Sequence, residues 1–280
     1  MTDGGITVEA PQDDDGRRHV DQPHLERPSA ARMYDYYLGG GHNFAVDREA
    51  AARVVEIYPN AALIAQANRA FLARAVKHLL AAGVRQFLDL GSGIPTAGNV
   101  HQVIDAVSPG ARVVYVDIDP VAIAHSETIL GGRTDVGVVH ADVRHPDEVL
   151  DSPITRRLID FDQPVGVLAV AVLHFVSPDD DPAGVLARYR EAVAPGSYLA
   201  LSHGTVDRRP ENVAKVSGVY RNTRDPTTFR TREEVAQLLT GWELLEPGLV
   251  WLPQWRPDWP DEATEDPSWT EMVCAVGRKV

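Results

Sequence analysis

Two glycines and two aspartates lie close together in the strings QFLDLGSGIPT and RVVYVDIDP. In the first string, an apolar run containing Asp89 leads into a turn with Gly91 and Gly93. Glycine lacks a Cβ atom, so a strand can turn sharply into a helix there while its backbone lies close to a ligand. The apolar run of the second string ends at Asp117, whose carboxylate could accept hydrogen bonds from both hydroxyls of a ribose. These residues indicate a site for a nucleoside cofactor.

The residues around the turn help to separate two cofactor classes, NAD and S-adenosylmethionine. Thr96 stands where the dinucleotide pattern has its third glycine, which weakens the case for a pyrophosphate site. Asp89 lies two residues before Gly91, where its negative charge would repel a pyrophosphate but attract the ammonium and sulfonium groups of S-adenosylmethionine. The residues therefore favour S-adenosylmethionine and leave NAD as the alternative.

The composition is that of a folded, acidic protein. A chain of 280 residues with 44% hydrophobic residues is long enough for one large α/β domain. The formal net charge of −13 argues against a broad surface for nucleic-acid phosphates, so no nucleic-acid partner is expected. Cys274 is the only cysteine, which excludes an intrachain disulfide. No Cys/His zinc spacing is present, so we expect no metal site and favour a reducing, cytoplasmic compartment.

Signals for a membrane span or for export are also missing from the sequence. The longest apolar run, VGVLAVAVLHFV, is well short of the roughly 20 residues that cross a bilayer. No charged-then-apolar leader follows Met1. We therefore expect a cytoplasmic protein without a membrane partner.

The chain divides by composition into three parts. Residues 1–27 contain few large apolar side chains and are expected to form a disordered tail. Residues 28–82 are expected to form a helical lid or cap segment, and residues 83–280 the cofactor-binding domain. Cap and stop signals in the second part predict three helices, over about 30–38, 47–58 and 61–82.

Seven apolar runs rich in Val, Leu and Ile predict strands, near 85–90, 112–117, 136–140, 165–172, 197–203, 243–251 and 269–278. Near-continuous apolar runs are typical of parallel strands covered on both faces. No helix pattern separates the last two runs, so they should pair as an antiparallel hairpin. The expected fold is α/β, with a Rossmann-like, seven-stranded, mostly parallel sheet, a C-terminal antiparallel hairpin and an added N-terminal helical segment.

Start signals for helices lie between and after these strands. Thr96 follows the glycine turn, and the pairs Asp119-Pro120 and Ser177-Pro178 each place a capping side chain before a proline. Thr231 and Glu234 form a capping box late in the chain. Both the apolar runs and the helix start signals therefore support an alternation of strands and helices.

From about residue 27 onward the chain resembles the class I S-adenosylmethionine-dependent methyltransferases. More narrowly, it is similar to a poorly characterised actinobacterial family with an N-terminal block like RPSAARMYDYYLGGGHNFAVDREAA. The further matching strings are FLDLGSGIPT, NVHQV, VVYVDIDP, HADVRHP, VLHFV and APGSYLALSH. The resemblance implies S-adenosyl-L-methionine as cofactor and methyl transfer as activity, but it supplies no methyl acceptor.

The resemblance also implies roles for single residues. Asp89 and the turn Gly91, Ser92 and Gly93 would line the methionine and ribose part of the cofactor. Asp117 would hold the ribose hydroxyls. For the adenine, the class pattern implies contacts from Ile118, from Asp142 to the amino group, and from the backbone amide of Val143.

His174 follows the fourth predicted strand, at the edge that would face the transferred methyl group. It could act there as a general base toward a hydroxyl or amine of the acceptor. Alternatively, it packs as a histidine in an apolar strand end, because methyl transfer can proceed by positioning alone.

The block RPSAARMYDYYLGGG suggests an aromatic lid hinged at its glycines. Arg32 and Tyr36 are four residues apart and would share one helix face, with the guanidinium near the carboxylate of the cofactor. The alternative is an N-terminal helix that packs for stability and ends at its glycines.

The acceptor is the least defined part of the site. At the place where methyltransferases of bases or amides carry an NPPY-type motif, this chain reads AVLHFV, which favours a small molecule or natural product. Trp251, Trp255, Trp259 and Trp269 could roof its pocket or pack within the hairpin. Two other functions stay open, a noncatalytic S-adenosylmethionine-binding protein that acts through a partner and an NAD-dependent oxidoreductase. The sequence leaves the oligomeric state undetermined.

Overall fold

A computed structural model describes residues 26–96, 98–258 and 266–280. Most of the predicted tail, residues 1–25, lies outside these ranges, as does Trp259. None of the described helices is both long and apolar enough to cross a membrane.

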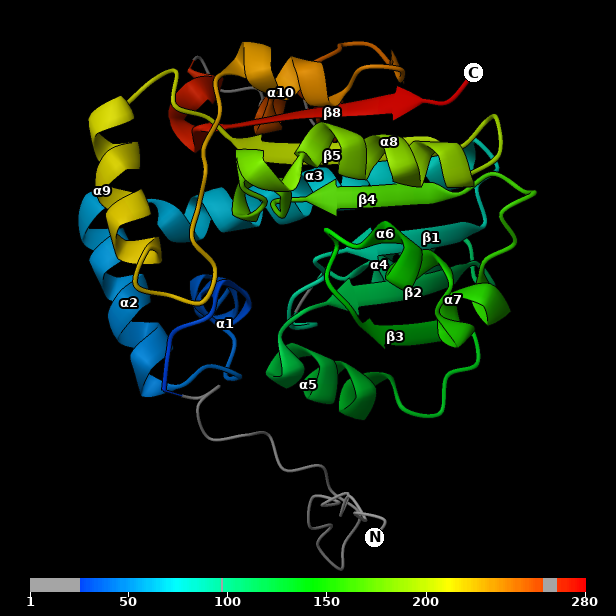
Figure 1. The fold of residues 1–280 in the computed structure, drawn as a ribbon, viewed down its shortest axis with the longest axis horizontal. Helices are drawn as coiled ribbons and strands as arrows, with labels where there is room; N and C mark the ends of the chain where they lie inside the picture. Colours follow the sequence, from blue (N-terminus) through cyan, green and yellow to red (C-terminus); the bar gives the residue numbers. More distant parts are fainter. Residues whose placement is uncertain (1–25, 97, 259–265) are drawn as a thin grey trace, which may run out of the picture.

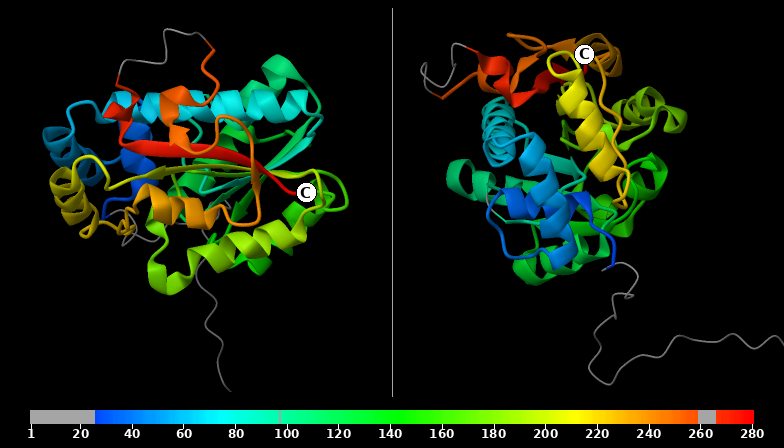
Figure 2. Two further views of the ribbon diagram at one scale, coloured as in Figure 1. Left: turned by 90° about the horizontal axis from the view of Figure 1, so that it is seen from above. Right: turned by 90° about the vertical axis from the view of Figure 1, so that its left-hand side faces the viewer.

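Within the described residues, an eight-stranded sheet forms the centre of the protein, with helices on both faces (Figures 1 and 2). The strand order is β3-β2-β1-β4-β5-β8-β6, and β7 also pairs with β8. The first five strands are parallel, and β8 runs antiparallel between β5 and β6. The strands are β1 Gln86–Leu90, β2 Arg112–Asp117, β3 Val136–His140, β4 Gly166–Val170, β5 Tyr198–Gly204, β6 Glu243–Leu244, β7 Val250–Trp251 and β8 Met272–Arg278.

The predicted α/β class, the mostly parallel sheet and the antiparallel C-terminal strands are confirmed. The run 243–251, predicted as one strand, is interrupted and forms β6 and β7. The interruption contains Pro247, which has no N–H to donate to a ladder, and Gly248, whose φ is +81°. Residues 267–270 form a 3₁₀ helix, so the last strand begins at Met272.

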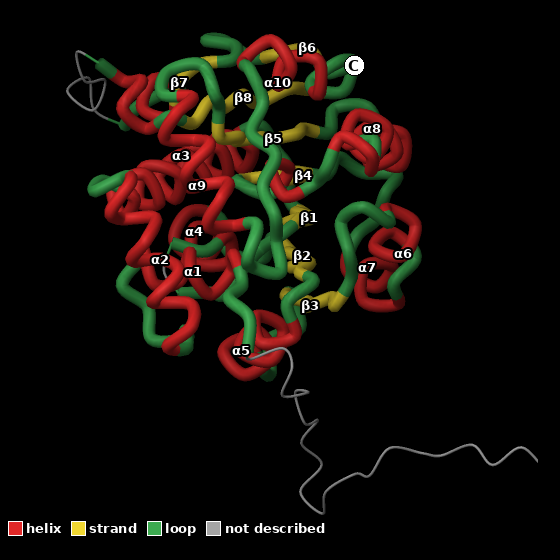
Figure 3. Tube along the Cα trace, turned by 60° about the vertical axis from the view of Figure 1, so that its left-hand side comes forward, coloured by secondary structure: helices red, strands yellow, loops and turns green. Residues whose placement is uncertain are grey.

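Two layers of helices bury the faces of the sheet (Figure 3). Helices α3 and α4 pack on one face, while α6, α7, α8 and α10 pack on the other. The helices are α1 Ala30–Tyr37, α2 Ala45–Ile57, α3 Ala61–Ala81, α4 Val100–Val107, α5 Pro120–Leu130, α6 Pro146–Leu150, α7 Pro153–Leu158, α8 Pro182–Ala192, α9 Pro210–Tyr220 and α10 Arg232–Leu238.

Two helices begin later than their sequence signals predict. The helix after the glycine turn begins at Val100 rather than near Thr96, whose hydroxyl instead donates a 2.5 Å hydrogen bond to Asp35 Oδ1. After Ser177 the chain forms only a 3₁₀ turn, and α8 begins at Pro182, where Asp181 accepts a hydrogen bond from the next turn. In both places a capping residue closer to the helix replaces the predicted one.

Helices α1, α2 and α9 form a third apolar cluster at the carboxyl ends of the parallel strands, and we call these three helices the cap (Figure 1). Met33, Val54 and Tyr220 are among the buried side chains that join them. Helix α3, which lies in the segment 28–82, packs against the sheet. The cap therefore combines the N-terminal helices with a helix from late in the chain.

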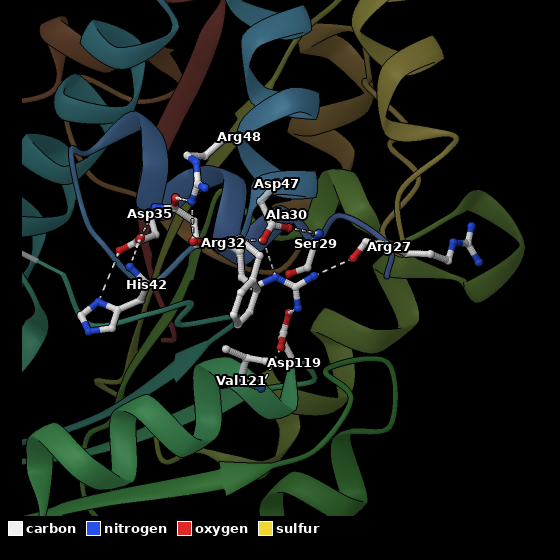
Figure 4. A network of polar contacts seen from close by, with 12 residues as sticks. Arg27, Ser29, Ala30, Arg32, Asp35, His42, Asp47, Arg48, Asp119 and Val121 are labelled. Carbon is white, nitrogen blue, oxygen red and sulfur yellow. Dashed lines mark hydrogen bonds and ion pairs between the residues drawn. The ribbon is translucent and has the colours of Figure 1, made fainter. Parts of the chain in front are cut away.

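A buried guanidinium fastens the cap to the sheet edge (Figure 4). Arg32 on α1 is fully buried, and its Nε donates to Asp47 Oδ2 of α2 at 2.9 Å. Its Nη1 lies 3.3 Å from Asp119 Oδ2, just beyond β2, and its Nη2 donates to the Arg27 carbonyl at 2.6 Å. Asp47 also accepts a hydrogen bond from the Ser29 amide. One side chain thus connects two cap helices with the end of β2.

Replacing the guanidinium should destabilise the protein strongly. Arg32→Met removes the cation and leaves two buried carboxylates unpaired, which costs on the order of 3–5 kcal/mol in the free energy of unfolding. Arg48→Met is a matched control, because the Arg48 side chain is exposed and, among the described residues, bonds only to Asn43, so its change should stay within about 0.5 kcal/mol. Urea unfolding followed by circular dichroism measures both. Equal, small losses would show that the ion pairs contribute little.

Candidate functional site

A cavity of about 620 Å³ lies between the cap and the carboxyl ends of the parallel strands. Helices α1, α2, α3 and α9 supply side chains to its wall, together with the loops that follow β1, β2, β3, β4 and β5. One end of the cavity, the glycine-turn end, is formed by Asp89, Gly91, Ser92, Gly93, Asp117, Ile118, Asp119, Asp142, Val143 and Arg144. The other, the aromatic end, is formed by Tyr37, Tyr58, His174, Phe175, Tyr220, Phe229, Thr270, Glu271 and Met272.

The two glycines of the turn are required by the backbone. Gly91 has a φ of +66° and Gly93 a φ of +64°, a conformation that favours glycine. A Cβ atom on Gly91 would lie 2.3 Å from a methyl carbon of Val172. The Gly93 amide donates a 2.7 Å hydrogen bond to Asp117 Oδ2, which ties the turn to the end of β2.

Asp117 and Asp89 are buried carboxylates at the ends of neighbouring strands. Asp117 accepts hydrogen bonds from the amides of Gly93 and Asp119, yet burial raises its pKa to about 6. Burial also raises the pKa of Asp89 to about 7, against the opposing effect of the nearby Arg69 charge and with a further rise from Asp117. Both groups therefore titrate close to neutral pH.

The remaining residues assigned to the adenine also lie at the glycine-turn end. Ile118 is 42% exposed and lines the cavity beside Asp117. Asp142 lines it from the loop after β3 and forms an ion pair with Arg144 at 2.5 Å. The carbonyl of Val143 accepts a hydrogen bond from Tyr189. The fold thus gathers the loops after β1, β2 and β3 at one end of the cavity.

Arg32 and Tyr36 do not line the cavity, in contrast to the prediction from their spacing. The guanidinium of Arg32 is engaged by Asp47 and Asp119, and Tyr36 is 37% exposed. Helix α1 instead turns Tyr34 and three other residues toward the cavity, which are Ala30, Ala31 and Tyr37. The spacing of four residues places Arg32 and Tyr36 on the same face of α1 but does not say which way that face points. Packing of α1 against α2 turns that face away from the cavity.

Arg69 on α3 is a cavity residue that the sequence reasoning missed. Its guanidinium lies 5.4 Å from the ring centre of Tyr34, and its Nε is buried without a hydrogen-bond partner among the described residues. Its charge lowers the pKa of Asp89 in part, which places a cation close to that carboxylate. The available signal was the polar pair Asn68-Arg69 in an otherwise apolar stretch of a helix that packs on the sheet.

His174 lies at the aromatic end, in a short 3₁₀ helix after β4. Its ring stacks on Phe229 at 5.5 Å and meets His203 edge-on at 5.4 Å. Burial, with the charges of His203 and Arg230, holds its pKa well below the usual range. Its Nδ1 is buried with no hydrogen-bond partner in the described part of the chain. His174 is therefore a neutral imidazole with unused hydrogen-bonding capacity.

His203 beside it has both nitrogens engaged. Arg230 Nη1 lies 3.0 Å from Nε2, and because arginine can only donate, Nε2 accepts. The other nitrogen, Nδ1, then carries the proton and donates to the Gly204 carbonyl at 2.7 Å. His203 does not line the cavity. It supports the wall against which the His174 ring lies.

The tryptophans that could have roofed the cavity do not line it where the structure describes them. Trp255 is fully buried against Phe71 on the other side of α3. Trp251 and Trp269 are half-buried beside β8 and also lie away from the cavity wall. Trp251 and Trp269 therefore pack beside the C-terminal strand β8, and Trp255 packs against α3.

Comparison with known proteins places the chain in a family. Residues 16–280 match the family model described as S-adenosyl methyltransferase. A solved structure from Thermobifida fusca YX, assigned to the methyltransferases, is 40% identical with a TM-score of 0.85, and the match covers 93% of this chain and 98% of that one. A protein of the duf574 family from Streptomyces avermitilis MA-4680 is 37% identical with a TM-score of 0.84, over 91% and 99% of the two chains.

A more distant likeness concerns the fold alone. The pyocyanin biosynthetic protein PhzM is 19% identical with a TM-score of 0.50, and the match covers 95% of this chain and 78% of that one. Curated proteins give no match. The family model covers nearly the whole chain and includes the glycine turn, Asp117 and the C-terminal strands. The chain therefore belongs to the S-adenosyl methyltransferase family and is an enzyme whose cofactor is S-adenosyl-L-methionine.

Proposed function

We propose that this enzyme transfers the methyl group of S-adenosylmethionine to a small-molecule acceptor, with the cofactor at the glycine-turn end of the cavity and the acceptor at the aromatic end. The observation that carries the proposal is one cavity of about 620 Å³ that joins both ends under the cap. This volume lies in the range of small-molecule sites, roughly 300–1,000 Å³. Because the cap helices cover the cavity, they favour a small acceptor that can be enclosed and disfavour a polymer.

The charges at the glycine-turn end suit the cofactor. Asp117 lines this end of the cavity, and we propose that it accepts hydrogen bonds from the ribose hydroxyls, as the class pattern implies. Asp89 and Arg69 are neighbouring groups of opposite charge, and the methionine part of the cofactor carries an ammonium and a carboxylate. We propose that Asp89 holds the ammonium and Arg69 the carboxylate.

Adenine would lie in the remaining part of this end. Ile118 offers an exposed apolar side chain on the cavity wall, and Asp142 offers a carboxylate at the edge of the same space. We propose that Ile118 packs against the ring, and that Asp142 and the backbone of Val143 bind its polar edge. Arg144 would keep Asp142 ionised through their ion pair.

The chain's own contribution to the reaction is mainly orientation and exclusion of water. When bound, S-adenosylmethionine supplies an electrophilic methyl group whose sulfonium charge disappears during transfer. The cap covers the cavity and limits solvent around the reacting groups. His174 is neutral and can accept a hydrogen bond from the acceptor. Its lowered pKa makes it a poor site to keep the released proton, so we propose that His174 positions the acceptor.

Two alternatives from the sequence lose support. The family assignment favours S-adenosylmethionine over NAD, and an NAD-dependent oxidoreductase retains only the shared glycine turn. The noncatalytic alternative loses support because the matched family consists of methyltransferases. A natural-product acceptor, a cytoplasmic location and an actinobacterial source remain proposals, the last supported by relatives from Thermobifida and Streptomyces.

Transfer to a small molecule has a direct test. The purified enzyme, incubated with methyl-labelled S-adenosylmethionine and a cell extract, should place label in a new compound of the extract below about 1 kDa, which chromatography separates from the labelled donor. The physical reason is the enclosed cavity, which admits a small acceptor under the cap. Heat-inactivated enzyme is the control. Label confined to protein or nucleic acid would contradict the proposal.

Cofactor binding should depend on Asp117 and Arg69. Asp117→Ala removes hydrogen bonds to a charged group worth on the order of 1.5–3 kcal/mol each, so the Kd for S-adenosylhomocysteine should rise at least about tenfold. Arg69→Gln should raise it similarly, through the lost carboxylate contact. Asp151→Asn, at an exposed surface ion pair, is the matched control and should leave Kd unchanged. Calorimetric titration measures all of them, and unchanged affinity in Asp117→Ala would place the ribose elsewhere.

Cofactor affinity should also vary with pH. Asp89 and Asp117 have pKa values raised to about 7 and about 6, so acidification below pH 8 progressively removes the negative charge that attracts the ammonium. Affinity for S-adenosylhomocysteine should therefore fall between pH 8 and pH 5.5 and level off above pH 8, with proton release on binding near pH 6.5. Titrations in buffers of different ionisation enthalpy check both effects. A flat pH profile would count against ionised Asp89 as the ammonium partner.

A further inference from the structure

The aromatic end of the cavity has walls suited to a flat ring. His174 and Phe229 stack with only 19° between their planes, and Phe175 meets Tyr220 at 5.8 Å. Tyr37 adds a further ring from α1. Aromatic side chains make large contacts with other rings in offset or edge-on arrangements. Aromatic side chains therefore make up much of the wall at this end.

Glu271 is a buried carboxylate at this end. It directly precedes β8, is 6% exposed and lines the cavity. Its Oε2 accepts a hydrogen bond from the hydroxyl of Tyr58, at the end of α2. Its Oε1 accepts no hydrogen bond from a described residue, although an Arg209 nitrogen lies 3.3 Å away in an ion pair. Burying a carboxylate is costly unless its oxygens are satisfied, and the ion pair with Arg209 leaves Oε1 able to accept a hydrogen bond as well.

The backbone conformation of Glu271 is unusual and is consistent with a ligand-binding role for its side chain. Its φ is +50°, in the left-handed region that a side chain other than glycine rarely adopts. Such conformations persist where the surrounding structure holds them, and they cluster at ligand sites. Here the contacts with Tyr58 and Arg209 hold the side chain between β8 and the cap.

His174 adds a second buried polar atom to the same end, because its Nδ1 also lacks a hydrogen-bond partner among the described residues. A neutral imidazole offers one acceptor nitrogen, and an ionised carboxylate offers only acceptors. A ligand that satisfies Glu271 must therefore carry a hydrogen-bond donor, and the unprotonated nitrogen of His174 can accept from a second donor. A ligand with its own negative charge would meet the carboxylate of Glu271 and be disfavoured.

We propose that the methyl acceptor is an uncharged aromatic molecule with hydroxyl or amino groups, whose ring packs against His174, Phe175 and Phe229 and whose donors bind Glu271 and His174. This inference rests on the proposed function, since it assigns the acceptor to the aromatic end. The aromatic walls favour a ligand with an aromatic ring. The hydrogen-bond acceptor atoms of Glu271 and His174 favour hydroxyl or amino groups on that ring. The negative charge of Glu271 disfavours an anionic ligand.

A matched series of naphthalenes tests the proposal on the full chain saturated with S-adenosylhomocysteine. The probes are 2-naphthol, 2-naphthylamine, unsubstituted naphthalene and 2-naphthoate, with Kd measured by calorimetry at pH 7.5. We expect 2-naphthol or 2-naphthylamine to bind at least tenfold more tightly than naphthalene and 2-naphthoate. Which of the two binds more tightly distinguishes a hydroxyl from an amino acceptor. Equal binding of naphthalene or tighter binding of 2-naphthoate would overturn the proposal.

Variants assign the selectivity to the two side chains. Glu271→Gln should reduce the preference for the donor-bearing probe over naphthalene at least fivefold, whereas Glu243→Gln, at an exposed position of β6, should leave it unchanged. His174→Phe keeps a ring against Phe229 and removes both ring nitrogens, so it should lower the same preference even if Glu271→Gln fails to fold. An unchanged preference in His174→Phe, and in Glu271→Gln where it folds, would overturn the assignment.

Binding of S-adenosylhomocysteine distinguishes failure of the acceptor proposal from failure of the proposed function. If the wild-type protein does not bind S-adenosylhomocysteine, the proposed function fails, and the acceptor proposal fails with it. If S-adenosylhomocysteine binds but the naphthalene series shows no preference for donors, only the acceptor class is wrong. Both results are obtained from the same protein preparation.

Discussion

The enclosure of the cavity depends on the buried guanidinium of Arg32. It pairs with Asp47 in the cap and with Asp119 beyond β2, so the charges of three segments are satisfied only when the cap lies on the sheet edge. Unpaired burial of any of these groups would be costly, which makes the docked arrangement specific as well as stable. The Asp119 amide in turn donates a hydrogen bond to Asp117, so Asp119 connects Arg32 with the proposed ribose ligand. The cap and the glycine-turn end are therefore parts of one polar network.

Sheet topology divides the cavity into two chemically different ends. The loops after β1, β2 and β3 bring carboxylates together, and with Arg69 they form a polar end suited to a zwitterionic cofactor. The segments beside β4, β5 and β8 bring His174, Phe229 and Glu271 together under the cap. Because β1 and β4 are neighbours in the sheet, the two ends meet where a methyl group would pass between them. This division follows from strand order and needs no second domain.

Local signals in the sequence predicted which residues lie together at the glycine-turn end. Gly91, Gly93 and Asp117 act within a few residues of their strands, and the alternation of strands and helices brings their loops to one edge. Predictions failed for side chains whose hydrogen-bond or ion-pair partners lie far away in the sequence. Thr96 has a hydroxyl suited to capping but donates it to Asp35, and Arg32 has a charge suited to a ligand but is held by two aspartates. Arg69 and Glu271 are single charged residues in segments without a recognisable motif.

By itself the sequence determined the α/β fold, the glycine turn and a binding edge for S-adenosylmethionine, because periodicity and turn chemistry act over short distances. Only the tertiary structure decided which charged residues face the cavity. Arg69 comes from α3 and Glu271 from the residue just before β8, about two hundred residues later in the chain. Their meeting depends on packing of the cap and on the position of β8 between β5 and β6, which no local pattern specifies.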